Sequence, residues 1–450
     1  MKYFVAVPYL LQVCGLFPFS SHVVFGDTSR IRYNRCFIVW TIVGVVIVIA
    51  ECILGFTADI FMCLRAIPFT VEVMKFITNV GSHLLSVIES WITRERQESI
   101  WKMNGKAEKM LNKSDEAMQN ACYKKIFYKF TIYLVLTIAI ETHYVLSVHN
   151  SYDYFMTKVW FVNIISSIVC RIRYLQHVMY TTLLAFWFSN IKDELKELSK
   201  VCRGESKISS LSSAPDPQSP VSTSKNKRFT EKITPSTMVA PKTIRKGNGL
   251  LCNEGSDSCE EDKLILQRLD VLKEMYNMLF EVSEDLNSCF GIAQLANLLD
   301  NFVQLTCEFY WIYILLANNE LHNLMEEVLS VLPTIAILIL LLSSCEKCLE
   351  EVRYIGFYIH EIERDSANYD FDLVVENFAL QVLTERFEFN VAGFFSMSFN
   401  LLQEMFGAIT TYMVILIQFT PSTGTSDEPP PGVNIHNFEE SIKKHTTKIT

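Results

Sequence analysis

The chain has 450 residues, of which 50% are hydrophobic and 12% aromatic, and its mean hydropathy is +0.21. A soluble domain needs a polar shell, so a positive mean hydropathy over this length argues against a soluble protein and favours an integral membrane protein. The formal net charge of −9 is a sum over acidic and basic segments. It identifies no partner and gives no reason to expect nucleic acid.

The N-terminal segment, residues 1–35, only superficially resembles a signal peptide. It begins with MKYFVAVPYLLQVCGLFPF, but Pro8 and Pro18 interrupt the apolar run and no small-residue cleavage pattern follows. We therefore expect this segment to be retained on the cytoplasmic side, close to the membrane.

The apolar residues fall into blocks long enough to cross about 30 Å of hydrocarbon as helices. We place these spans near residues 36–58, 70–92, 127–148, 157–186, 290–316, 327–345 and 395–419. The second is the weakest because it contains Glu72, Lys75 and Glu89. The predicted fold is all-α, with seven transmembrane helices, the first four of them within residues 36–202.

The charges of the loops predict the orientation. Basic residues precede the first span and follow the second: Lys2, Arg30, Arg32 and Arg35, then Arg94, Arg96, Lys102, Lys106, Lys109, Lys113, Lys124 and Lys125. The loops 149–156 and 317–326 have no lysine or arginine. Because basic loops stay in the cytoplasm, we expect the N-terminus inside and, after seven spans, the C-terminus outside.

Residues 203–262 differ in composition from the rest of the chain. They are rich in Ser, Thr, Pro and Lys and contain few aromatic residues. Such a segment cannot bury enough apolar surface to offset its chain entropy, so we expect a disordered cytoplasmic loop. Ser219 and Thr234 lie next to prolines and are candidate phosphorylation sites, although an unmodified tether explains the composition equally well.

Helical periodicity returns in the region 263–345. Apolar residues recur at steps of three and four, namely Leu269, Leu272, Met275, Leu279, Val282 and Leu286. This pattern predicts an amphipathic helix that runs without a break into the fifth span and projects into the cytoplasm. Residues 346–394 are again amphipathic, so we expect cytoplasmic anchor helices that pack on one another or on a neighbouring subunit.

The last span, within residues 395–419, ends in ITTYMVILIQF. Thr411, Tyr412, five apolar residues, Gln418 and Phe419 match the C-terminal signature of insect gustatory receptors. NSCFGIAQL before the fifth span and HEIER after the sixth resemble the branch of this family that contains the fructose sensors. The chain departs from the family in continuing past the signature with a Pro-rich polar tail, residues 420–450, which we expect to be extracellular and disordered.

This resemblance implies a tetrameric, ligand-gated cation channel in the plasma membrane of a sensory neuron. The seventh helices of four subunits would surround the pore, in a homotetramer or a heterotetramer with other gustatory receptors. Gln418 and Phe419 would then lie at the extracellular gate, with Thr411 and Tyr412 lower on the pore helix. Polar side chains can line an open pore and apolar ones can close it by dewetting. The alternative is that Tyr412 and Gln418 only form hydrogen bonds between helices.

The resemblance also implies a pocket for a small-molecule tastant in the outer half of the bundle. Candidates are Gln304, Glu308 and Trp311, which share one helix face, together with Glu141, His143 and Tyr144; Trp160, Asn163, Tyr310 and Tyr313 are also available. These groups suit a sugar, or a cationic alkaloid held by charge and cation–π attraction. The sixth span offers only Ser330 and Thr334, which favours an apolar or cationic plant compound over fructose. Alternatively, Glu308 pairs with Arg171 or Arg173 and only braces the bundle.

Other classes find little support in the sequence. The cysteines lie mostly in apolar blocks, and the CxxC at Cys345 and Cys348 has no second ligand pair, so we expect no metal site and no cofactor. We find no enzyme motif. An insect odorant receptor shares the predicted fold and remains the nearest alternative. A G-protein-coupled receptor needs the opposite orientation, and a transporter would show paired broken spans.

Overall fold

The computed structural model describes residues 6–17, 39–46, 49–50, 53, 67–110, 116–151, 154–202, 256–319, 321–362 and 369–419. About half of the first predicted span, the segment 203–255 and the tail 420–450 lie outside these residues. Within them the chain is almost entirely helical, as the sequence predicts.

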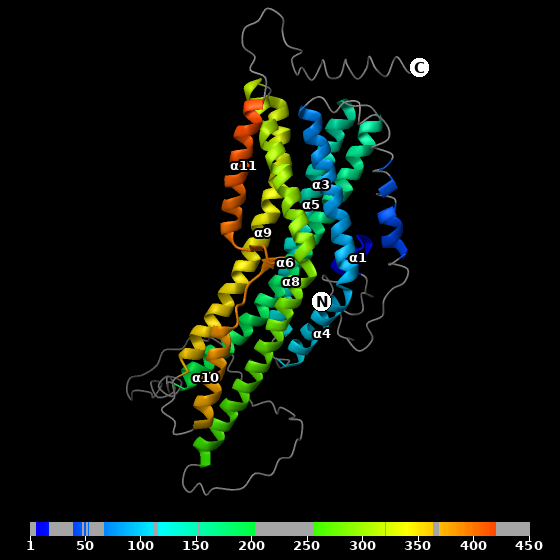
Figure 1. The fold of residues 1–450 in the computed structure, drawn as a ribbon. Helices are drawn as coiled ribbons and strands as arrows, with labels where there is room; N and C mark the ends of the chain where they lie inside the picture. Colours follow the sequence, from blue (N-terminus) through cyan, green and yellow to red (C-terminus); the bar gives the residue numbers. More distant parts are fainter. Residues whose placement is uncertain are drawn as a thin grey trace, which may run out of the picture.

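Six long helices follow the other predicted spans. They are α3 (Ile67–Ile92), α5 (Glu116–Ser151), α6 (Tyr154–Cys202), α8 (Ser256–Ala317), α9 (Leu321–His360) and α11 (Phe399–Phe419). The described part also contains three shorter helices, α1 (Ala6–Val13), α4 (Arg94–Met110) and α10 (Tyr369–Thr384), and helical residues at 39–46, 49–50 and 53. Figure 1 shows the long helices side by side in an elongated bundle, with α11 at one end of the molecule and α10 at the other.

The longest helices extend well beyond the thickness of a membrane. At 1.5 Å per residue, the 62 residues of α8 cover about 93 Å, roughly three times the hydrocarbon core of a bilayer. The predicted amphipathic face of its first half is confirmed, because Leu269, Met275, Leu279 and Leu286 are each at most 1% exposed. There α8 packs against α10, with Tyr276 edge-on to Phe378 at 5.6 Å.

Three helices in the described part are apolar and long enough to cross a membrane on length and composition alone: Ala117–Tyr144, Leu324–His360 and Phe399–Gln418. The other long helices contain charged residues, among them Lys75 and Glu89 in α3, Arg171 and Arg173 in α6, and Glu308 in α8. Each of these side chains is at most 8% exposed. These five charged side chains therefore face the interior of the bundle, where other helices can supply polar partners.

A short β-hairpin separates α10 from α11. Strand β1 (Asn390–Val391) pairs antiparallel with β2 (Phe395–Ser396), and Asn390 faces Ser396. Ala392 and Gly393 have positive φ values of 50° and 77°, which turn the chain between the strands. This corrects the predicted helical span 395–419, because α11 begins only at Phe399.

The start of α8 corrects a second predicted boundary. The helix begins at Ser256, seven residues inside the segment 203–262 that composition marks as disordered. The residues 256–262 are acidic, and negative side chains in a first turn are favoured by the helix dipole. Composition alone hides this start because the same residues are as polar as a loop.

Candidate functional site

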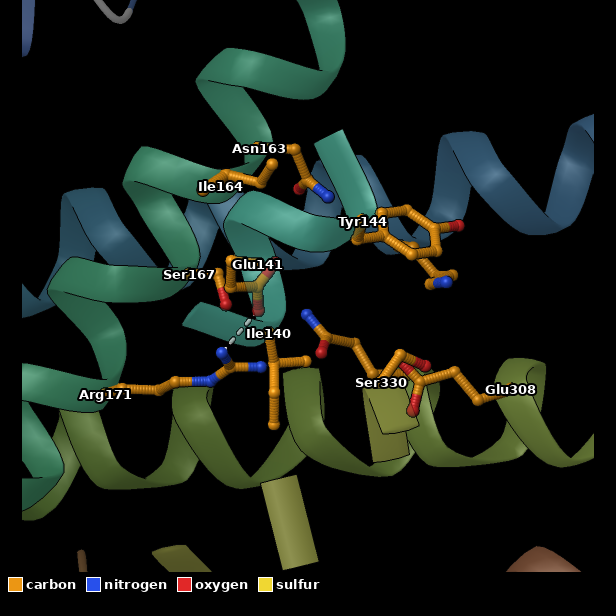
Figure 2. A pocket seen from close by; sticks show the side chains of 11 residues that line it. Ile140, Glu141, Tyr144, Asn163, Ile164, Ser167, Arg171, Glu308 and Ser330 are labelled. Carbon is orange, nitrogen blue, oxygen red and sulfur yellow. Dashed lines mark hydrogen bonds and ion pairs between the residues drawn. The ribbon is translucent and has the colours of Figure 1, made fainter. Parts of the chain in front are cut away.

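A buried polar cavity lies in the half of the bundle that contains α11. Helices α3, α5, α6, α8 and α9 all contribute to it, and its lining consists of Lys75, Ile140, Glu141, Tyr144, Asn163, Ile164, Ser167, Arg171, Gln304, Glu308 and Ser330. Figure 2 shows side chains of several helices converging on one space. The cavity measures about 40 Å³. That is room for a few water molecules, whereas small-molecule pockets usually span about 300–1,000 Å³.

Two arginines of α6 form ion pairs, but neither pairs with Glu308. Arg171 donates from Nη1 to Glu141 Oε1 of α5, a contact that Figure 2 marks with a dashed line. Arg173 donates from Nη2 to Glu89 Oε2 of α3 at 3.2 Å. The hypothesis that Glu308 braces the bundle through one of these arginines is therefore wrong.

Glu308 is the least satisfied charged group of the lining. It is 6% exposed, and its Oε2 atom has no hydrogen-bond partner among the described residues. A buried carboxylate without full pairing is costly and marks a functional position in a membrane protein. Lys75 lines the same cavity and supplies a second positive charge next to Arg171.

A layer of hydrogen bonds lies next to this cavity and joins three of these helices, α3, α6 and α8. Gln304 donates from Nε2 to both carboxylate oxygens of Asp300, at 3.4 and 3.3 Å. Thr78 of α3 donates to Asp300 Oδ1 at 2.9 Å, and Asn79 donates to Asn163 Oδ1 of α6 at 2.6 Å. These hydrogen bonds hold the side chains of Gln304 and Asn163 in place and so orient their polar groups at the cavity.

The structure brings some of the predicted ligand residues together and leaves others apart. Gln304, Glu308, Glu141 and Tyr144 share the cavity, as do Asn163 and, from the sixth predicted span, Ser330. His143 is exposed and does not line it.

Three aromatic candidates and Thr334 also lie outside the lining. Trp311, about one helical turn beyond Glu308, and Tyr310 are absent from it. Tyr313 lines a groove described below, and Thr334 is buried elsewhere. The side chain of Trp160 falls outside the described residues.

The sequence reasoning missed Lys75 and Ser167 as lining residues. Lys75 drew attention only because it weakened the second span. An ionisable residue inside a predicted span is itself a signal of a functional position. Ser167 lies among many small polar residues of α6, and nothing in the sequence distinguishes it.

The predicted pore residues lie on an uncovered side of α11. Thr411, Tyr412 and Gln418 are all exposed, Tyr412 to 52%. Tyr412 keeps one contact within the bundle, edge-on to Phe302 of α8 at 5.7 Å between ring centres. Phe419 is the last residue of the helix, and its side chain falls outside the described part.

An open groove between α8 and α11 has a different character. Its volume is about 390 Å³, and its lining is mostly aromatic and aliphatic: Phe309, Ile312, Tyr313, Leu316, Phe406, Ile409, Thr410 and Met413. This groove lies on the outside of the single chain, whereas the polar cavity is enclosed by helices.

An elongated bundle of long helices, three of them apolar enough to cross a membrane, with buried charged residues, is typical of an integral membrane protein. Residues 6–423 match the family model of the 7tm Chemosensory receptors. The chain therefore belongs to the 7tm Chemosensory receptor family.

Three relatives from Drosophila melanogaster are gustatory receptors. The chain is 24% identical over 187 residues to putative gustatory receptor 2a (36% of this chain, 44% of the relative) and 27% identical over 159 residues to gustatory receptor 23a (34% and 41%). It is 23% identical over 163 residues to the gustatory receptor for bitter taste 66a (34% and 30%). Each alignment covers less than half of the relative.

The fold resembles that of an insect olfactory receptor over nearly the whole chain. The olfactory receptor OR5 from Machilis hrabei superposes with a TM-score of 0.56 at 10% identity, covering 93% of this chain and 98% of the receptor. The same receptor in complex with eugenol gives a TM-score of 0.54 at 11% identity over the same shares. The likeness establishes the fold.

Proposed function

We propose that this protein is a gustatory receptor that works as a tastant-gated, non-selective cation channel. The observation that carries the proposal is the buried polar cavity, in which the incompletely paired Glu308 lies among side chains of five helices. Family membership supplies the class of protein, and the cavity supplies a place for a ligand.

The proposed topology has seven spans, the N-terminus inside and the C-terminus outside. The basic loops around residues 30–35 and 94–125 support it, because such loops stay in the cytoplasm. The length of α8 agrees with it: about two thirds of a 93 Å helix must lie outside the hydrocarbon. In this proposed topology the first half of α8, the end of α9 and α10 form a cytoplasmic anchor, and the spans cross the plasma membrane of a sensory neuron.

The proposed assembly is a tetramer, either of identical subunits or with other gustatory receptors. The uncovered side of α11 supports a pore formed by the α11 helices, with Thr411 and Tyr412 along it and Gln418 and Phe419 at its outer end. The anchor also exposes large apolar side chains, including Phe357 at 56% and Leu383 at 75%, which a neighbouring subunit would cover.

We propose that the tastant carries a positive charge. The lining contains two positive groups, Lys75 and Arg171, and two carboxylates, Glu141 and Glu308. Asp300, bonded to the lining residue Gln304, adds a third carboxylate. A protonated amine would stabilise the ionised form of Glu308 and give its Oε2 atom a hydrogen-bond partner. Because the cavity holds only a few waters at rest, the helices must separate when the ligand enters.

Expression of the chain alone in oocytes tests the proposal. We expect a rapid inward current in response to quinine, a protonated amine, and no response to fructose. Glu308→Gln keeps the shape of the side chain and removes its charge, so it should raise the half-activating quinine concentration at least about tenfold. Trp311→Ala is the matched control on the same helix and should leave that concentration unchanged. A chain that reaches the surface and conducts in response to none of these compounds refutes homomeric channel function.

An odorant receptor subunit is the second candidate, supported by the superposition on OR5, which has been solved with eugenol. A neutral aromatic compound would suit an apolar pocket better than this charged lining. If eugenol activates the channel and Glu308→Gln leaves this activation unchanged, the result favours an odorant receptor subunit.

A further inference from the structure

Helix α8 connects two distant parts of the molecule. Its outer half supplies Gln304 and Glu308 to the cavity. Along the helix, about 20 Å from Gln304 and about 26 Å from Glu308 at 1.5 Å per residue, the turn around Gly291 contacts the hairpin that leads into α11. Gly291 lies in the segment NSCFGIAQL, residues 287–295, none of which lines the cavity.

The hairpin contacts one face of α8 through Asn287 and Gly291, which lie four residues apart. Asn287 donates from Nδ2 to Glu388 O at 2.8 Å and accepts from the backbone N–H of Asn390 at 3.1 Å. Gly291 faces Ala392, and a Cβ added at Gly291 would lie 3.3 Å from both the N and the Cα atoms of Ala392. An alanine at position 291 would therefore contact the backbone of Ala392 tightly, and the hairpin would have to shift by a few tenths of an ångström to accept it.

The hairpin also contacts helices α6 and α9. Phe389 lies edge-on to His177 of α6 at 6.4 Å between ring centres, and Met397 Sδ lies 3.9 Å from Cys345 Sγ of α9. Met397 also donates its backbone N–H to Phe389 O at 2.8 Å. The hairpin therefore connects the start of α11 to α6, α8 and α9.

We infer that the contact between Asn287, Gly291 and the hairpin positions the pore helix and transmits movement of α8 from the cavity to the gate. This inference rests on the proposed channel function. Gly291 and Asn287 are positioning residues that touch neither ligand nor pore. Changing this contact should shift the balance between closed and open channels while leaving the conducting pathway intact.

The test compares gating in full-length channels that carry Gly291→Ala, Ala392→Gly or both substitutions. Gly291→Ala should change the ratio of ligand-free to maximal current at least about fivefold. Ala392→Gly removes the methyl group at 3.5 Å but leaves the backbone N and Cα atoms at 3.3 Å, so the double variant should keep most of the change seen in Gly291→Ala. The reversal potential and the surface expression should stay constant. The control is Gly81→Ala in α3, where an added Cβ meets no atom within 4 Å.

The possible failures are distinguishable. A wild-type chain that is surface-expressed but never conducts would refute the homomeric channel function on which this inference rests, and the inference with it. A conducting wild type with unaltered gating in Gly291→Ala would refute only the role of the contact. If Gly291→Ala does not reach the surface, Asn287→Ala, which removes both hydrogen bonds without adding volume, decides the matter: gating like the wild type overturns the inference.

Discussion

Removal of the Arg173 guanidinium should destabilise the bundle far more than removal of the whole ion pair. Arg173 is fully buried and bonds Glu89 Oε2 at 3.2 Å, Cys289 O at 2.6 Å and Gln176 Oε1 at 2.8 Å, and it stacks on Phe290 at 4.0 Å. Arg173→Met preserves most of the volume and leaves the Glu89 carboxylate buried without its cation. Breaking a buried pair in this way costs about 3–5 kcal/mol.

The double variant Glu89→Gln/Arg173→Met removes both charges. Glu89 Oε1 accepts the backbone N–H of Ile292 at 2.8 Å, and a glutamine oxygen can keep that bond. What remains is the loss of hydrogen bonds, about 1–2 kcal/mol. We therefore expect the double variant to be about 2 kcal/mol more stable than Arg173→Met alone.

The assay is the free energy of unfolding of purified protein in mixed micelles, obtained by titration with SDS. Glu89→Gln alone completes the cycle and gives the coupling energy between the two side chains. If Arg173→Met and the double variant lose equal amounts of unfolding free energy, the charge left on Glu89 is not the source of the instability, and the reasoning fails.

Two further contacts should have smaller effects. Lys192 donates to Glu351 at 2.7 Å between α6 and α9, so Lys192→Met should cost about 0.5–1 kcal/mol in the same assay. Burial alone would lower the pKa of Lys192, but the hydrogen bond to Glu351 raises the pKa above its ordinary value. The stabilisation should therefore persist at neutral pH and be lost only as the pH rises through this raised pKa. Tyr133 of α5 donates to the carbonyl of Pro333 inside α9 at 2.8 Å, and Tyr133→Phe should cost about 1 kcal/mol.

These two predictions have distinct controls. For Lys192, the single variant Glu351→Gln should lower the free energy of unfolding by a similar amount. If Lys192→Met lowers that free energy equally at neutral pH and at pH 11.5, the electrostatic explanation is contradicted. For Tyr133, the rings of tyrosine and phenylalanine fill the same space, so an undetectable loss would mean that the hydroxyl contributes nothing to the packing of α5 on α9.

Periodicity predicted most of the helical fold. The steps of three and four from Leu269 to Leu286 identified the face of α8 that is buried. The spacing of Gln304 and Glu308 placed both on one face, and both line the cavity. Such local patterns work because a helix fixes the relative directions of its own side chains.

What could not be predicted depends on contacts between helices. Arg171 had several carboxylates within reach in principle, and only the packing of α5 on α6 selects Glu141 over Glu308. The hairpin at 390–396 was missed because strands of two residues have no periodicity, and its position depends on Gly291 in another helix. Trp311 continues the face of Glu308, but the cavity ends before it.

Helix α8 runs without a break from the anchor to the cavity. The number of residues between Gly291 and Gln304 therefore fixes both the distance and the angle between the hairpin contact and the cavity residues. Inserting one alanine there would rotate the hairpin seat by about 100° relative to the cavity residues and shift it by about 1.5 Å. Inserting seven residues would restore the angle within about 20° but lengthen the helix by about 10 Å. Homologous receptors that share this arrangement should therefore keep this interval free of insertions and deletions, while tolerating changes in the side chains along it.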